Sequence, residues 1–358
     1  MALHRTGNLV RSVGHIRGGR VQYIRRSRIR HRAATTLLVV VTLLAGCSGE
    51  DPQPTAGEDA TADGGATTQA PTGGAALSPR HADIAYVPDG TPEHTLDVYL
   101  PGSGPGPFPV VIWVHGGGWR MGDKSAIGSA DEQMSLLTQR LLDNGYAVAA
   151  PNYRLVPTAK FPEPMQDVAA AVRYLRANAA QFQLDPAEFA LMGDSAGAHL
   201  GAMAALTSGN AQLQGDLGET GADSSVKAFI GYYGIYDLKM RTEDQLDSPC
   251  GEAKPGTESS HGQLIGADPD SPDGESVAAA GSPVTYVNGD SPAVLLISGR
   301  YDCTAPYQQA ERFHADLKAA GATTELSLID APHGDDVFFT DPQLQEQVLE
   351  FLKASFGG

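Results

Sequence analysis

The sequence predicts an α/β fold built on a mostly parallel, doubly wound sheet with antiparallel N-terminal strands. Short apolar runs alternate with helical patterns from about residue 109 onward. Runs of this kind are typical of parallel strands that helices cover on both faces. Two earlier runs, residues 83–87 and 95–100, are joined by a turn around Pro88-Asp89-Gly90. This short connection predicts an antiparallel pair at the start of the sheet.

The later alternation predicts an ordered set of elements. Strands are expected at residues 110–114, 147–150, 188–192, 228–232, 294–298 and 325–329. Helices are expected at residues 132–144, 165–182, 196–206, 307–320 and 343–356. The first of these is followed by Gly145, a typical helix C-cap. This pattern predicts one α/β domain over residues 81–358.

One segment of that domain, residues 239–284, breaks the alternation. It is polar, rich in Gly, Pro and Asp, and lacks a sustained period. We expect an irregular insertion here. Long stretches of this kind are either binding loops or lids, or plain surface insertions. Its place between two strands whose carboxyl ends flank the expected site favours a position near the pocket.

The N-terminus has the pattern of an export signal. Residues 1–46 contain nine arginines and no acidic residue, and they end in the apolar stretch 33–44. Twelve residues are too few to span a bilayer, which needs about 20. We therefore expect residues 1–46 to be a signal peptide that is removed on export to the cell envelope.

The end of that signal, Leu44-Ala45-Gly46-Cys47, resembles a bacterial lipobox. The resemblance implies cleavage before Cys47, lipid attachment to its sulfur, and anchorage at the outer face of the cytoplasmic membrane. Ordinary secretion is the alternative. Residues 47–80 are Gly, Ala, Thr, Pro and acidic residues with almost nothing to bury, which predicts a disordered tether.

The charge balance excludes one class of partner. The chain has 25 basic and 42 acidic residues, and removal of the nine arginines of the signal leaves 16 minus 42, a formal charge of −26. Nucleic acid is therefore not an expected partner. We also expect no metal and no cofactor.

Three cysteines are present, and one of them, Cys47, is assigned to lipid. The other two, Cys250 and Cys303, would reside in a compartment where disulfides persist, so we expect them to pair. Two unpaired thiols are the alternative. The bridge would hold the loop that contains Asp302.

Two short strings carry the chemistry. Gly193-Asp194-Ser195-Ala196-Gly197 fits the G-x-S-x-G nucleophile elbow, a tight turn between a strand and a helix that presents the serine hydroxyl. His115-Gly116-Gly117-Gly118-Trp119 follows another strand. The N–H groups of Gly117, Gly118 and Ala196 are the expected oxyanion donors.

The serine needs a base and an acid. In folds that contain a nucleophile elbow, the acid follows the serine along the chain and the histidine comes last. His333 and Asp302 each come shortly after an expected strand, one strand apart. We therefore predict His333 as base, over His261 and His314, and Asp302 as acid, with Asp237 as the runner-up.

The strings HGGGW, NYRL at residues 152–155, GDSAG, the YDCTAPYQQ segment from Tyr301, and APHG at residues 331–334 together resemble an α/β-hydrolase carboxylesterase. The nearest groups are hormone-sensitive-lipase-like and bacterial feruloyl-esterase-like (BD-FAE-type) esterases. The resemblance implies the same three residues, Ser195, Asp302 and His333. The lid helices that precede HGGG in lipase-like members have no counterpart, which argues against long-chain lipase activity.

The resemblance implies hydrolysis of small-molecule carboxylic esters, either short-chain esters or aryl or sugar esters, through an acyl-enzyme. A peptidase of the same fold is the enzymatic alternative, because the same triad can cleave amides. A non-catalytic binding module on the cell surface is the alternative of another class. Covalent reaction of an active-site probe at Ser195 separates an enzyme from a binding module.

Overall fold

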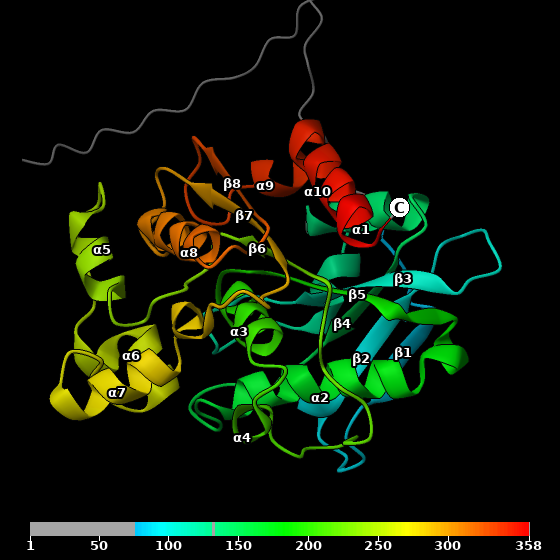
Figure 1. Ribbon diagram of the computed structural model, residues 1–358, viewed down its shortest axis with the longest axis horizontal. Coiled ribbons are helices and arrows are strands. Elements are labelled where there is room, and N and C mark those ends of the chain that lie inside the picture. The colour runs from blue at the N-terminus through cyan, green and yellow to red at the C-terminus, as the bar shows by residue number, and fades with distance from the viewer. Residues whose placement is uncertain (1–75, 131–132, 358) are drawn as a thin grey trace, which may run out of the picture. The chain divides into compact units, whose positions relative to one another are not determined.

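The computed structural model describes residues 76–130 and 133–357 (Figure 1). The expected signal peptide, Cys47 and most of the tether lie outside the described residues. Within the described ranges, none of the helices combines the length and apolarity that crossing a membrane requires.

The domain contains one eight-stranded sheet with the strand order β1-β2-β4-β3-β5-β6-β7-β8. β1 pairs with β2 and β2 with β4 in antiparallel orientation, and every later pair is parallel. The strands are β1 His81–Ala85, β2 Thr95–Tyr99, β3 Phe108–Val114, β4 Ala147–Pro151, β5 Leu184–Asp194, β6 Ala228–Tyr232, β7 Ala293–Gly299 and β8 Thr324–Ile329. The mostly parallel, doubly wound sheet with an antiparallel start is confirmed.

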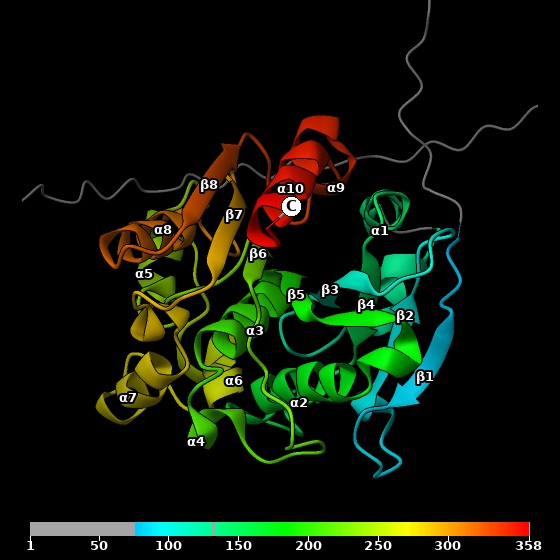
Figure 2. The ribbon, with the colours of Figure 1, turned by 45° about the vertical axis from the view of Figure 1, so that its right-hand side comes forward.

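Helices cover both faces of this sheet (Figures 1 and 2). One apolar core contains the buried faces of α2, α3 and α8, and a second contains those of α1, α9 and α10. The helices outside residues 239–284 are α1 Met134–Asp143, α2 Glu163–Ala177, α3 Ser195–Leu206, α4 Ala211–Gln214, α8 Gln308–Ala319, α9 Val337–Thr340 and α10 Pro342–Ser355. The strands of the parallel part are almost fully buried, as their continuous apolarity predicts.

One expected helix is shorter than its pattern. α2 ends at Ala177, and a separate 3-10 helix, Ala179–Phe182, follows it. Asn178 lies between them at a φ of −107°, outside the helical region. The break turns the chain toward β5, which begins earlier than expected, at Leu184.

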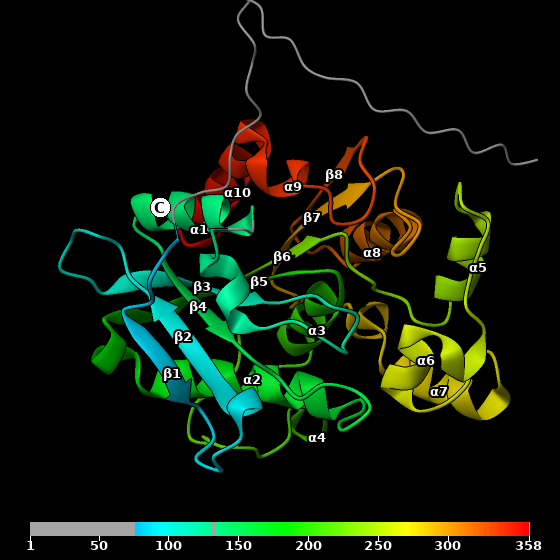
Figure 3. The same ribbon diagram turned by 180° about the vertical axis from the view of Figure 1, so that it is seen from behind.

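The expectation of an irregular insertion at residues 239–284 was wrong. Besides short 3-10 turns, the segment forms three α-helices, α5 Arg241–Asp247, α6 Ser260–Ile265 and α7 Pro272–Ala280, which are grouped together in Figure 3. Each has six to nine residues, too few for a helical period to stand out in the sequence. Local signals define two of them, since Ser259 and Ser271 cap α6 and α7 by accepting N–H bonds.

Candidate active site

The turn between β5 and α3 holds Ser195 in an unusual conformation. Its φ is +49°, a left-handed value that a serine adopts only where its surroundings impose it. The close packing explains the two flanking glycines. A Cβ on Gly197 would lie 2.0 Å from the Val114 carbonyl oxygen, and one on Gly193 would lie 2.7 Å from the Gly197 carbonyl carbon. The nucleophile-elbow geometry predicted from the sequence is therefore present.

Three predicted residues meet at the carboxyl ends of the parallel strands. His333 Nε2 lies 2.9 Å from Ser195 Oγ, and His333 Nδ1 lies 2.6 Å from Asp302 Oδ2. A carboxylate only accepts hydrogen bonds, so Nδ1–H donates to Asp302 and the lone pair of Nε2 accepts from the Ser195 hydroxyl. This single neutral tautomer aims a proton acceptor at the serine.

The carboxylate of Asp302 is held by its own loop. Its Oδ1 accepts hydrogen bonds from the backbone N–H groups of Thr304 and Ala305, at 2.7 and 2.8 Å. Oδ2 is therefore the oxygen left for His333. The side chain is buried, with 1% exposed. Both oxygens of this buried carboxylate therefore have hydrogen-bond donors, from the backbone on one side and the imidazole on the other.

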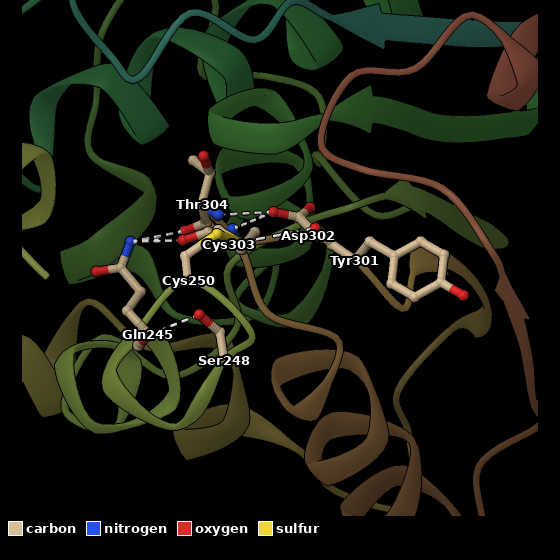
Figure 4. Close-up of a disulfide and its surroundings, with 8 residues drawn as sticks. Gln245, Ser248, Cys250, Tyr301, Asp302, Cys303 and Thr304 are labelled. Atoms are coloured by element: carbon tan, nitrogen blue, oxygen red, sulfur yellow. Dashed lines mark hydrogen bonds between the residues drawn. A yellow bond between two sulfur atoms is a disulfide. The ribbon is translucent and has the colours of Figure 1, made fainter. Parts of the chain in front are cut away.

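A disulfide braces the same loop (Figure 4). Cys250 and Cys303 are joined, with 5.9 Å between their Cα atoms, as expected from the sequence. Gln245 of α5 adds hydrogen bonds from its side-chain amide to the carbonyl oxygens of Cys303 and Thr304. The loop that carries Asp302 is thus tied to the inserted segment covalently through Cys250 and by hydrogen bonds from α5.

The predicted oxyanion donors lie beside the serine. Gly117 and Gly118 line the pocket that also contains Ser195 and His333. Gly117 has a φ of +106°, and a Cβ there would lie 2.1 Å from the Met121 carbonyl oxygen, so only glycine fits. Ala196 is in the first turn of α3, where backbone N–H groups have no partner within the helix.

Hydrogen bonds from outside the triad hold this glycine loop in place. The Asp194 carboxylate accepts a hydrogen bond from Gly116 N at 2.9 Å. Tyr153 donates its hydroxyl proton to the His115 carbonyl oxygen at 2.9 Å and stacks on the His115 ring. The NYRL segment therefore acts structurally here.

Trp119 connects the glycine loop to the elbow helix. Its indole N–H donates to His199 Nδ1 at 3.2 Å, and His199 Nε2–H donates to the Gly281 carbonyl oxygen at 2.7 Å. Burial lowers the pKa of His199 to about 4, so the ring is neutral at pH 7. Trp119 stands in the glycine-loop motif and His199 two residues after the elbow motif, but no pattern along the chain indicates that the two side chains bond to each other.

The alternative acids and bases lie elsewhere. Asp237 accepts hydrogen bonds from the N–H groups of Lys239 and Met240. His261 is buried against Arg241, and His314 contacts the Thr324 hydroxyl. None of the three takes part in the hydrogen-bonded chain from Ser195.

A pocket of about 370 Å³ opens above Ser195. Its lining comes from the glycine loop, the elbow, the loop after β6 and the inserted helices, which contribute Arg241 and Ser260. Tyr233 packs edge-on against His333, with 4.8 Å between ring centroids. Across the described ranges, His, Cys, Asp and Glu side chains form no group of three that could hold a metal ion.

Comparison with known proteins decides the family. The BD-FAE family model matches residues 96–317, which is more than half of the chain. The chain belongs to the BD-FAE family. The match spans the glycine loop, Ser195 and Asp302, and His333 lies just beyond it.

Curated relatives of this BD-FAE member are esterases. The chain is 32% identical over 283 residues to the esterase LipQ of Mycobacterium tuberculosis, a match covering 77% of this chain and 62% of the relative. It is 29% identical over 259 residues to the isoprenylcysteine alpha-carbonyl methylesterase ICME of Arabidopsis thaliana, covering 70% and 56%. The chain thus matches less than two thirds of the length of each.

Solved structures agree on the fold. A truncated form of a carbohydrate esterase from gut microbiota is 27% identical and covers 77% of this chain and 96% of its own, with a TM-score of 0.69. Esterase B from Lactobacillus rhamnosis, at 23% identity and a TM-score of 0.61, covers 77% and 86% and shares the fold. The BD-FAE chain is thus a member of an esterase family with the α/β-hydrolase fold.

Proposed function

We propose that this protein is a serine carboxylesterase that hydrolyses small-molecule esters through an acyl-enzyme. The observation that carries the proposal is the continuous hydrogen-bonded chain Ser195–His333–Asp302, set at the floor of a pocket beside the glycine loop. A serine and a base within 3 Å, with a third group orienting the base, is the arrangement that activates a hydroxyl nucleophile.

In the proposed acylation step, Ser195 Oγ attacks the ester carbonyl carbon while His333 Nε2 takes the hydroxyl proton. The carbonyl oxygen becomes an oxyanion that the N–H groups of Gly117, Gly118 and Ala196 stabilise, each by about 3 kcal/mol. The tetrahedral intermediate then collapses. The carbon–oxygen bond to the alcohol breaks, and the His333 proton passes to the leaving alkoxide, which departs as the alcohol.

Deacylation repeats these events with water. His333 takes a proton from a water molecule, the resulting hydroxide attacks the acyl carbon, and the proton returns to Ser195 Oγ as the carboxylic acid leaves. Asp302 keeps the imidazole in the correct tautomer and stabilises the imidazolium that forms in both halves. The scheme needs no cofactor.

The pocket's size supports short acyl groups or compact aryl and sugar esters. A volume of about 370 Å³ lies at the lower end of the range for small-molecule sites, roughly 300 to 1,000 Å³. The test is turnover of a p-nitrophenyl ester series, from acetate to palmitate, by the full chain. We expect the highest kcat/KM at acetate to butyrate. A maximum at palmitate would contradict this assignment.

The same proposal places the enzyme at the cell envelope, anchored by lipid on Cys47. The lipobox-like sequence and the arginine-rich apolar segment before it support this. Metabolic labelling with an alkyne fatty acid should mark the wild-type protein and leave Cys47→Ser unmarked. Equal labelling of both, or none of either, would contradict lipidation at Cys47.

A further inference from the structure

Arg241, the first residue of α5, is a buried cation in the wall of the pocket that also contains Ser195. Its side chain is only 4% exposed, yet it lines the catalytic pocket together with Ser195 and His333. It also lines a second pocket of about 490 Å³ beside the disulfide. The two pockets share Arg120, Arg241, Ser260 and Thr304. The guanidinium therefore stands at the junction between the catalytic pocket and an adjoining polar one.

The groups that bond to this guanidinium are all neutral. Nε and one terminal nitrogen donate to the Thr304 carbonyl oxygen, at 3.3 and 3.1 Å. The other terminal nitrogen donates to Ser260 Oγ at 2.8 Å and to His261 Nδ1 at 3.1 Å. Burial, with the charge of Arg241 as a smaller cause, lowers the pKa of His261 to about 3. His261 is therefore an uncharged acceptor at pH 7.

Arg120 adds a second positive charge to the same place. It follows the glycine loop, is exposed, and lines both pockets. Burial lowers the pKa of Arg241 to about 10. The charge of Asp302 acts in the opposite direction and raises this pKa, whereas repulsion from Arg120 lowers it further. Arg241 therefore stays protonated at pH 7.

Carboxylates nearby do not neutralise this pair. Among described residues, none forms an ion pair within 4.0 Å of Arg120 or Arg241, although five other arginines have such partners. Asp302 acts on Arg241 only from a distance, and its oxygens bond to His333 and backbone N–H groups. Glu252 and Glu258 line the second pocket but not the catalytic pocket. A buried charge without an ionic partner is costly unless a ligand supplies the counter-charge.

We propose that Arg241 and Arg120 form a subsite for a carboxylate carried by the ester substrate, on its acyl part or on its leaving alcohol. The proposal rests on the proposed esterase function and narrows its substrate class to anionic esters. A guanidinium suits a carboxylate, to which it can donate paired N–H bonds. Four of the five Arg241 N–H groups already have protein acceptors, so the paired bonds would come from Arg120, and Arg241 would add its charge and its one remaining N–H group. A chain with a formal charge of −17 repels anions at long range, so a local pair of cations at the pocket would provide the selectivity.

The test uses two matched pairs of esters. Mono-p-nitrophenyl succinate and its succinamate differ by a carboxylate or an amide on the acyl side. Para-acetoxybenzoate and para-acetoxybenzamide differ in the same way on the leaving group. We expect kcat/KM of wild type to favour the carboxylate member of at least one pair about tenfold or more, and which pair does so identifies the half of the substrate that binds.

Arg120→Gln removes an exposed cation without disturbing the buried packing, and Arg140→Gln is its matched control. Arg140 lies on α1 and pairs with Glu346, away from both pockets. We expect Arg120→Gln to lower the carboxylate-to-amide ratio about 5- to 10-fold and Arg140→Gln to leave it unchanged. Arg241→Gln should lower it further if that variant folds. High salt should reduce the ratio in wild type.

The outcomes separate this inference from the proposed function. Turnover of the neutral esters with a ratio near one in both pairs, unchanged by Arg120→Gln, would overturn the carboxylate subsite and leave the esterase intact. Failure of wild type to hydrolyse any of the four esters would instead count against the esterase itself. A ratio that falls equally in Arg120→Gln and Arg140→Gln would show a general charge effect and overturn the subsite.

Discussion

Trp119 and His199 join the two motifs that form the candidate site. The indole N–H of Trp119, at the end of the glycine loop, donates to His199 Nδ1 in the elbow helix α3. Both side chains are fully buried. A buried hydrogen bond thus ties the glycine loop to the elbow helix, and the link continues through His199 to Gly281 at the end of α7.

Trp119→Phe should weaken both stability and catalysis. It removes the donor and leaves His199 Nδ1 buried without a partner, at an expected cost of about 1 to 3 kcal/mol in the free energy of unfolding. The loop would lose part of its positioning, so we expect kcat to fall while KM changes little. Urea denaturation and ester kinetics measure the two effects. An unchanged free energy of unfolding would show that the indole hydrogen bond does not contribute to stability.

His199 also gives the protein a defined pH dependence of stability. Its pKa is about 4 in the folded state, against an ordinary value of 6.5. Between pH 4 and pH 6.5 the unfolded chain binds a proton at this histidine that the folded chain does not. The free energy of unfolding is therefore undiminished above pH 6.5 and decreases as the pH falls toward 4. The linked effect is on the order of 3 kcal/mol.

His199→Gln removes that titration. The variant should be less stable than wild type at pH 7, yet the difference between them should shrink as pH falls from 6.5 to 4.5. His314→Gln, at a part-buried histidine on α8, is the control and should change the pH slope less. Parallel stability curves for wild type and His199→Gln across this range would contradict the assignment.

Opening the disulfide should loosen the loop that carries Asp302. The bridge closes a loop of 53 residues, which corresponds to about 4 kcal/mol in the chain-entropy model. Cys250→Ser with Cys303→Ser should therefore lower the melting temperature and slow fluorophosphonate labelling of Ser195. Reduction of wild type by dithiothreitol should give the same two changes. An unaltered labelling rate would mean that Asp302 is held without the bridge.

Gly117→Ala tests the oxyanion loop. The new Cβ would collide with the Met121 carbonyl oxygen, in a backbone conformation that alanine avoids, so the loop must shift. Displacing one oxyanion donor should lower kcat about 100-fold. Gly145→Ala is a matched control with a φ of +83° and open space around it. A loss of kcat as large in Gly145→Ala would assign the effect to strain alone.

The sequence allowed the sheet, most helices and the meeting of Ser195, Asp302 and His333 to be predicted. Parallel strands are recognisable as buried apolar runs, and their carboxyl ends necessarily converge, so loop residues just after neighbouring strands could be brought together without coordinates. Cys250 and Cys303 were predicted to pair because only two cysteines remained after Cys47.

Other parts of the site have no sequence signal. Arg241 begins a seven-residue helix in a segment without a period, and its place in the wall of the Ser195 pocket depends on how α5 and α6 pack against the Asp302 loop. The link between Trp119 and His199 likewise depends on side chains that meet across 80 residues of chain. Such contacts are set by tertiary packing, which residue patterns along the chain do not encode locally.

The most direct test of the central claim is covalent capture of the nucleophile. Wild type should be modified once by a fluorophosphonate, with the adduct on the peptide containing Ser195, and should release a burst of p-nitrophenol equal to the enzyme concentration before steady turnover. Ser195→Ala should give neither the adduct nor the burst. An adduct on another residue, or full ester turnover by Ser195→Ala, would contradict the account.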